Sequence, residues 1–116
     1  MIKEGNYAIQ INPAKKEVGL VVVGTFTPEK AQAFVNDYNK KVNSINASEY
    51  KLVLDCHETD ISSPTMVPEL QACFELYKQS GFNEVVFEIS NNPILKMQFN
   101  RLIRNVGLTN GKVVVD

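Results

Sequence analysis

The sequence has no tryptophan, a single histidine and two cysteines. Imidazole and thiolate groups supply most zinc ligands and many catalytic nucleophiles and bases, so this scarcity leaves little material for metal or nucleophilic chemistry. Two cysteines are too few for the disulfide framework of a small secreted domain, and Cys56 and Cys73 lack CxxC spacing. We expect two reduced core cysteines, with a Cys56–Cys73 disulfide as the alternative.

An excess of either charge is missing as well, because 12 basic side chains stand against 13 acidic ones and the formal net charge is −1. Proteins that bind nucleic acids or anionic membranes usually carry a clear basic excess, so we expect no nucleic-acid partner. No stretch approaches the ~18 apolar residues of a membrane span, and no apolar segment follows Met1. We therefore expect no membrane span and a cytoplasmic location.

What remains is the composition of one ordinary globular domain. The chain has 116 residues, of which 44% are hydrophobic and 22% are charged. A chain of this length buries roughly two-thirds of the surface that its unfolded form exposes, which is enough for one core but not for two. We expect a single domain over residues 1–116.

Hydrophobic patterning predicts a hairpin followed by three further strands. Residues 7–12 alternate between apolar and polar side chains, residues 18–23 are almost continuously apolar, and a polar turn separates them. The apolar run at residues 52–54 is too short for a buried helix and favours a central strand, with a polar segment over residues 56–63 after it. The last two strands are predicted at residues 84–89 and 112–115.

Three amphipathic helices are predicted between these strands. Thr27 and Asn92 each precede a proline, which is the pattern of an N-cap residue followed by proline at the first helical position. The start of the second helix stays open: Ser63 as N-cap places Pro68 in the second turn, whereas Thr65 as N-cap places it at the third position. The helices are expected to end near Asn46, at Gly81 and at Gly107.

The element order is thus ββαβαβαβ, which predicts an α/β domain with a mixed sheet of four to five strands. Strand–helix–strand units form right-handed crossovers between parallel strands, and the hairpin adds an antiparallel edge. Helices are expected to cover the sheet. Ligands and partners of such sheets usually meet the carboxyl ends of the strands, which points to the loop after Asp55.

That loop contains several groups capable of chemistry. Asp55, His57, Glu58 and Asp60 are competent metal ligands, but one histidine without a second cluster makes a weak site, and a solvated acidic loop is the simpler interpretation. Cys56 beside His57 is a second candidate, as an activated thiol pair. Neighbours on an extended strand point to opposite faces, which favours one side chain in the core and one in solvent.

A third hypothesis concerns a hydroxyl group at the start of the second helix. Ser62 or Ser63 lies where backbone N–H groups and the helix dipole favour an anion such as a phosphoryl group. The simpler alternative is a serine that only caps the helix.

Three stretches also carry a resemblance to a known family. They are residues 24–29 (GTFTPE), 50–55 (YKLVLD) and 98–107 (QFNRLIRNVG). With the order ββαβαβαβ and a serine-bearing loop after the third strand, they resemble the STAS domain of bacterial anti-sigma-factor antagonists. The resemblance is closer to the small SpoIIAA-like bacterial proteins, whose fold is shared with lipid-binding CRAL-TRIO domains.

The resemblance implies a non-enzymatic interaction or regulatory module with a protein partner and no cofactor. In the antagonists a serine in an Asp-Ser-Ser/Ala-Gly motif is phosphorylated, and Ser63 occupies that position within about one residue. The motif is degenerate here, since Ser62 replaces the aspartate. The implied interaction loop comprises Ser62, Ser63, Asp55 and Asp60. The relation to CRAL-TRIO domains implies an alternative, a small domain that binds an apolar ligand or lipid.

The last helix carries a basic face formed by Lys96, Arg101 and Arg104. A solvated face is the simpler interpretation, and a patch for an acidic partner is the alternative. Met97 and Ile103 flank the apolar stripe and predict either a deeper core or an exposed homodimer patch. The edge strand at residues 7–12 offers a second route to a homodimer.

Overall fold

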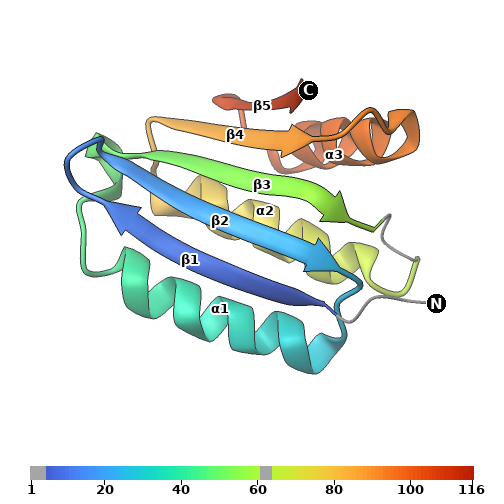
Figure 1. Ribbon diagram of the computed structural model, residues 1–116, viewed down its shortest axis with the longest axis horizontal. Helices are drawn as coiled ribbons and strands as arrows, with labels where there is room; N and C mark the ends of the chain where they lie inside the picture. Colours follow the sequence, from blue (N-terminus) through green and yellow to red (C-terminus); the bar gives the residue numbers. More distant parts are fainter. Residues whose placement is uncertain (1–4, 61–63) are drawn as a thin grey trace.

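The computed structural model describes residues 5–60 and 64–116, and within these ranges five strands and three α-helices follow one another in the predicted order (Figure 1). The fold class predicted from the sequence, a mixed α/β sheet with three helices, is confirmed. The elements are β1 (Asn6–Asn12), β2 (Glu17–Gly24), α1 (Pro28–Val42), the short 3-10 helix η1 (Ala47–Glu49), β3 (Lys51–Thr59), α2 (Val67–Ser80), β4 (Glu84–Ile89), α3 (Pro93–Val106) and β5 (Gly111–Val115).

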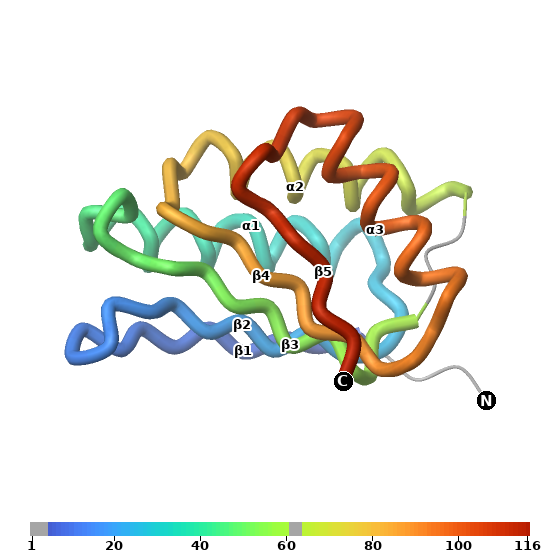
Figure 2. Tube along the Cα trace, turned by 90° about the horizontal axis from the view of Figure 1, so that it is seen from above, coloured from blue at the N-terminus to red at the C-terminus, as the bar shows by residue number. Residues whose placement is uncertain are grey.

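The strands lie in the sheet in chain order, β1-β2-β3-β4-β5. Strand β1 pairs antiparallel with β2, and the other three pairs are parallel. Each crossover therefore leads to the next strand on the same side of the one before it. Right-handed crossovers that all run in one direction place every helix on the same face of the sheet. Figure 2 shows α1, α2 and α3 on one side of the sheet, and no helix of the described residues covers the other side.

The core lies between this helix layer and the sheet. Strand β3 shows the division clearly, because Leu52 and Leu54 are buried beneath the helices while Val53 and Asp55 point to the helix-free face. Aromatic rings fill the centre, where the rings of Phe74 and Phe87 stack with 4.6 Å between their centroids. Within the described residues, no helix is both long and apolar enough to cross a membrane.

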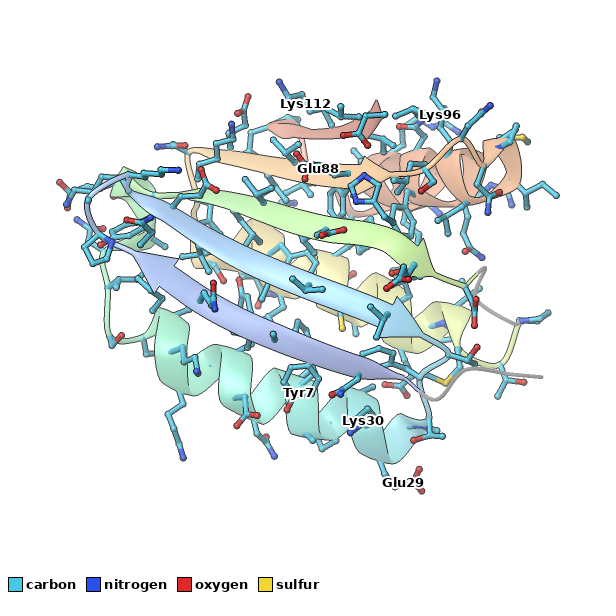
Figure 3. All side chains as sticks on the ribbon, in the orientation of Figure 1. Tyr7, Glu29, Lys30, Glu88, Lys96 and Lys112 are labelled. Atoms are coloured by element: carbon cyan, nitrogen blue, oxygen red, sulfur yellow. The ribbon has the colours of Figure 1, made fainter. Side chains whose placement is uncertain are left out.

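The helix-free face is polar at one end of the strands. Lys51 and Lys112 each lie 3.5 Å from a carboxylate oxygen of Glu84, so one carboxylate joins β3, β4 and β5 across this face. Glu88 lies further along β4 on the same side (Figure 3). Exposed ion pairs of this kind contribute little stability, so the face is held mainly by the backbone ladder and by the core beneath it.

Two predicted boundaries are wrong. Helix α1 ends at Val42, four residues before Asn46, because the chain tightens into i→i−3 bonds, with the N–H of Ile45 donating to the carbonyl of Val42. The hydroxyl of Ser44 also donates to the backbone carbonyl of Lys41 and competes with continuation of the helix.

Strand β3 is longer than predicted, since residues 56–59 continue it where a polar loop was expected. The polar side chains there are half-buried or exposed. This part of the strand therefore lacks the apolar pattern that would predict it. Helix α2 begins at Val67 with Met66 as N-cap, and Thr65 is not the cap. Pro68 occupies the second helical position, where its missing N–H costs nothing. The other cap candidate, Ser63, lies outside the described residues.

Candidate functional site

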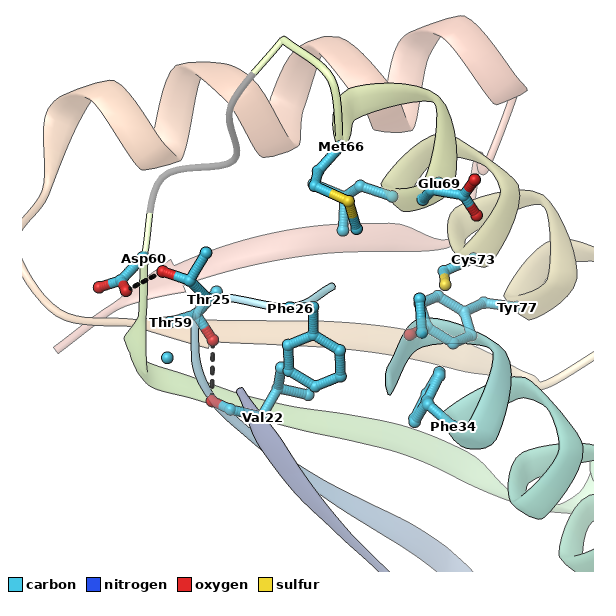
Figure 4. A pocket seen from close by; sticks show the side chains of 13 residues that line it. Val22, Thr25, Phe26, Phe34, Thr59, Asp60, Met66, Glu69, Cys73 and Tyr77 are labelled. Carbon is cyan, nitrogen blue, oxygen red and sulfur yellow. Dashed lines mark hydrogen bonds between the residues drawn. The ribbon is translucent and has the colours of Figure 1, made fainter. Parts of the chain in front are cut away.

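A small apolar pocket lies at the carboxyl ends of β2 and β3, beside the first turns of α1 and α2 (Figure 4). Its volume is about 90 Å³. Ligands of parallel sheets usually bind at the carboxyl ends of the strands, which is where this pocket lies. The apolar part of its wall comes from Val22, Phe26, Phe34, Met66, Leu70 and Tyr77.

The pocket lies where the regular pairing between β2 and β3 is interrupted. The register between them shifts after Val21, and Gly24 adopts a positive φ of 72° that turns the chain away from the sheet. Phe26 then folds back toward β1, where its ring centroid lies 6.4 Å from that of Tyr7. The wall of the pocket is thus built by a bulge, a glycine turn and one aromatic side chain.

Hydrogen bonds fasten the polar rim of the pocket. The hydroxyl of Thr25 donates to the carboxylate of Asp60, and the backbone N–H of Asp60 donates to the carbonyl of Gly24 over 3.2 Å. The hydroxyl of Thr59 donates to the carbonyl of Val22 over 2.8 Å. Asp60, one of the residues selected from the sequence, is therefore fixed at the mouth of the pocket.

Two ionisable side chains line the inner wall. Burial raises the pKa of the Cys73 thiol to about 11, and burial also raises the pKa of Tyr77 well above its usual range. Both groups are protonated at neutral pH. Cys73 therefore behaves as a small apolar side chain and not as a thiolate nucleophile.

A second cluster lies on the helix-free face, centred on His57. The ring Nδ1 of His57 lies 2.6 Å from Oδ1 of Asp55, and its Nε2 bonds the carboxylate of Asp116, which directly follows β5. The two hydrogen bonds, that of Asp116 first, raise the pKa of His57 to about 9. The hydrogen bond from His57 lowers the pKa of Asp55. An imidazolium thus joins β3 to the end of β5.

The structure separates the residues selected from the sequence. Asp55 and Asp60 belong to different clusters, one on the helix-free face and one at the pocket. Ser62 and Ser63 lie outside the described residues. Cys56 is buried on the opposite side of β3 from His57, and burial raises the pKa of its thiol to about 12.

These positions bear on two of the predictions, a disulfide between the cysteines and a metal site among the acidic residues. Cys56 and Cys73 are both buried and unbridged, which confirms the prediction of two free core thiols. Across residues 5–60 and 64–116, no three histidine, cysteine, aspartate or glutamate side chains are grouped as a metal site requires.

Sequence reasoning missed several residues of these clusters, including Asp116, Thr25 and Phe26. Asp116 bonds His57 across 59 positions of the chain, which no local pattern reveals. Thr25 and Phe26 belong to the stretch at residues 24–29 that carries the family resemblance, and no site role was predicted for them. The neighbouring Gly24 was the available signal, because a glycine between a strand and a helix cap often marks a turn with positive φ.

Comparison with known proteins adds no name to this geometry, since no family model matches the sequence and no curated protein matches it.

Proposed function

We propose that the protein is a non-enzymatic protein-interaction module of the STAS-like type, whose partner inserts one apolar side chain into the pocket at the ends of β2 and β3. The observation that carries this proposal is the pocket itself: an apolar wall, a polar rim and a volume of about 90 Å³. Binding energy at protein interfaces concentrates in a few anchor side chains that fill such pockets and are ringed by polar contacts.

The size of the pocket favours an anchoring side chain over a free ligand. Pockets that enclose drug-sized ligands have volumes of roughly 300–1,000 Å³, several times larger than this one. A lipid chain does not fit into about 90 Å³. The apolar wall still favours, as a second candidate, a very small apolar molecule, because dry cavities of comparable scale bind xenon or benzene.

The rim favours a basic partner. Asp60 and Glu69 are exposed carboxylates among the lining residues, and no described lysine or arginine lines the pocket. A partner whose apolar anchor is flanked by lysine or arginine therefore gains electrostatic complementarity, which mainly increases the association rate and the specificity.

The titratable groups support recognition over catalysis. The pKa of Cys73 lies at about 11, so its thiol is protonated at neutral pH. His57 has a carboxylate on each ring nitrogen and offers no free lone pair to a substrate. A general base needs that lone pair, and a nucleophilic cysteine needs a thiolate.

The resemblance also implies a phosphoacceptor at Ser63 or its neighbour Ser62, two or three positions after Asp60 in the sequence. A phosphoryl group there adds a charge of about −1.5 to −2 close in sequence to the acidic rim. In this proposal phosphorylation changes the affinity for the basic partner.

A pocket-filling substitution tests the proposal. Leu70→Trp on α2 occupies the pocket, and Asp60→Lys reverses the charge of its rim. A partner is first identified by affinity capture with the unchanged chain, and its dissociation constant is then measured by calorimetry with purified proteins. Each substitution is expected to weaken binding at least about tenfold.

Glu49→Lys supplies the matched control, because Glu49 is an exposed carboxylate on η1, outside the lining residues. It is expected to leave the dissociation constant unchanged. A partner that binds the Leu70→Trp variant as tightly as the unchanged chain contradicts the proposal. Benzene that shifts the amide resonances of Phe26 and Leu70 in an NMR titration would support the small-ligand candidate instead.

A further inference from the structure

A groove runs between α1 and α2 on the outer side of the helix layer. Its volume is about 310 Å³, and its apolar lining comes from Ala31, Val35, Ala72, Cys73 and Leu76. Glu69 and Glu75 lie along its α2 side, and no lysine or arginine of the described residues lines it. Gln32 and Gln79 complete the lining, so the groove mixes apolar and polar side chains and has an acidic edge, which fits an amphipathic basic helix.

Helix α3 has the complementary surface. Ile94 and Met97 are 62% and 63% exposed, the largest values among the exposed large apolar side chains of the described residues. Arg101 lies four residues after Met97, and Arg104 lies three residues after Arg101. These spacings place all four side chains on one face of the helix. The sequence of α3 contains no aspartate or glutamate.

Neither surface forms an ion pair with another residue that the structure describes. The ion pairs found among the described residues include Lys51–Glu84, Lys112–Glu84 and the two contacts of His57. The carboxylates of the groove and the arginines of α3 are not among them. Two exposed surfaces of one chain therefore carry opposite, unpaired charges beside exposed apolar side chains.

We propose that the occupant of the groove is α3 of a second copy of this chain, and that the two copies form a closed two-fold dimer. Helix α2 contacts both α1 and α3 and lies between them behind the sheet (Figure 1). When two helix layers face each other about a two-fold axis along the helices, each α3 lies over the groove of the other chain. Both contacts form at once, as in an isologous interface.

A second copy fits better than an anionic membrane. The basic face of α3 carries Lys96, Arg101 and Arg104, whereas the whole chain has a net charge of −1. Anionic lipid surfaces attract clusters of basic residues, and the acidic edge of the neighbouring groove opposes that attraction. The dimer does not depend on the pocket proposal, although Ala31, Glu69 and Cys73 border both cavities.

Charge reversal of each surface tests the dimer by sedimentation equilibrium. The unchanged chain is expected to sediment with the mass of two chains. The variant Arg101→Glu/Arg104→Glu and the variant Glu69→Lys/Glu75→Lys are each expected to raise the dimer dissociation constant at least about tenfold, because like charges then face each other.

An equimolar mixture of the two variants distinguishes this interface from others. In the mixed dimer one contact is native and the other has both charges reversed, so both are complementary. The dimer dissociation constant of the mixture is expected to lie within about threefold of that of the unchanged chain. Circular dichroism of each variant establishes that the fold is kept.

Lys15→Glu/Lys40→Glu is the matched control, since it reverses two exposed charges outside both surfaces and is expected to leave the dimer intact. The proposal is overturned if the unchanged chain is a monomer at about 200 μM. It is also overturned if the charge-reversed variants remain dimers, or if they become monomers that do not associate when mixed.

Discussion

At the scale of single residues, the His57 cluster shows how one imidazole can hold two strands that are not neighbours. Asp55 lies on β3, Asp116 follows β5, and β4 lies between these strands. The backbone N–H of Asp116 also donates to the carbonyl of Ile89 over 3.1 Å, which brings its carboxylate to the histidine. The cluster therefore fastens the end of the chain to the centre of the sheet.

This arrangement predicts a high titration midpoint. His57 is the single histidine, so its Hε1 resonance is assigned without ambiguity. In an NMR titration its pKa is expected at about 9, and Asp116→Asn is expected to lower that pKa toward the ordinary value of 6.5. A midpoint near 6.5 in the unchanged chain contradicts the bridge.

The same bridge predicts how stability depends on pH. The pKa of His57 is higher in the folded chain than its ordinary 6.5, so the folded state holds its proton more tightly. The stabilisation is complete below pH 6.5 and is lost as the pH rises from 6.5 to about 9. When the free energy of unfolding is measured in urea across this pH range, it should fall less with rising pH for Asp116→Asn than for the unchanged chain.

At the scale of elements, the helix starts follow local rules. The side chains of Thr27 and Asn92 each accept a hydrogen bond from the backbone N–H three residues later, and a proline follows each of them. Gly81 and Gly107 end α2 and α3 in the left-handed conformation. These boundaries were predictable because the cap, the proline and the glycine act within a few residues of one another.

The cap of α3 supplies a test at this scale. The carboxamide oxygen of Asn92 accepts from the N–H of Leu95 over 3.1 Å, so Asn92→Ala is expected to lower the free energy of unfolding by about 1 kcal/mol. Asn91→Ala, at the exposed neighbouring position, is expected to change it by less than about 0.5 kcal/mol. Equal losses in urea denaturation would show that the cap is not the stabilising feature.

Other boundaries were not predictable from local signals. The apolar spacing that predicts α1 continues to Ile45, yet the helix ends at Val42 and Ile45 packs outside it. Strand β3 continues through polar residues because its pairing with β2 reaches Gly24 and Thr59. For β3 a tertiary pairing satisfied the backbone, whereas α1 ends in local i→i−3 bonds; the apolar spacing records neither.

At the scale of the whole molecule, the helices of residues 5–60 and 64–116 cover one face of the sheet. The strand order never reverses, so there is no switch point between neighbouring strands at which a ligand crevice opens. The pocket depends instead on the bulge after Val21 and on the turn at Gly24. This explains why the cavity at the strand ends is as small as about 90 Å³.

The one-sided cover predicts unequal effects at adjacent positions of β3. Leu54 is 2% exposed beneath the helices, and Leu54→Ala is expected to lower the free energy of unfolding by about 2–5 kcal/mol. Val53 is half-buried on the helix-free face, and Val53→Ala is expected to lower it by roughly 1 kcal/mol. Comparable losses at the two positions would indicate that both faces are covered.

By itself, the sequence determined the order of the elements, the fold class and the burial of both cysteines. These features follow from apolar periodicity, caps and turns, all of which act over a few residues. Only the tertiary structure decided that Asp55 and Asp60 serve different clusters, that Asp116 reaches His57, and that a groove faces outward beside α2. Those arrangements join residues far apart in the chain, and they depend on the register and spacing of packed elements.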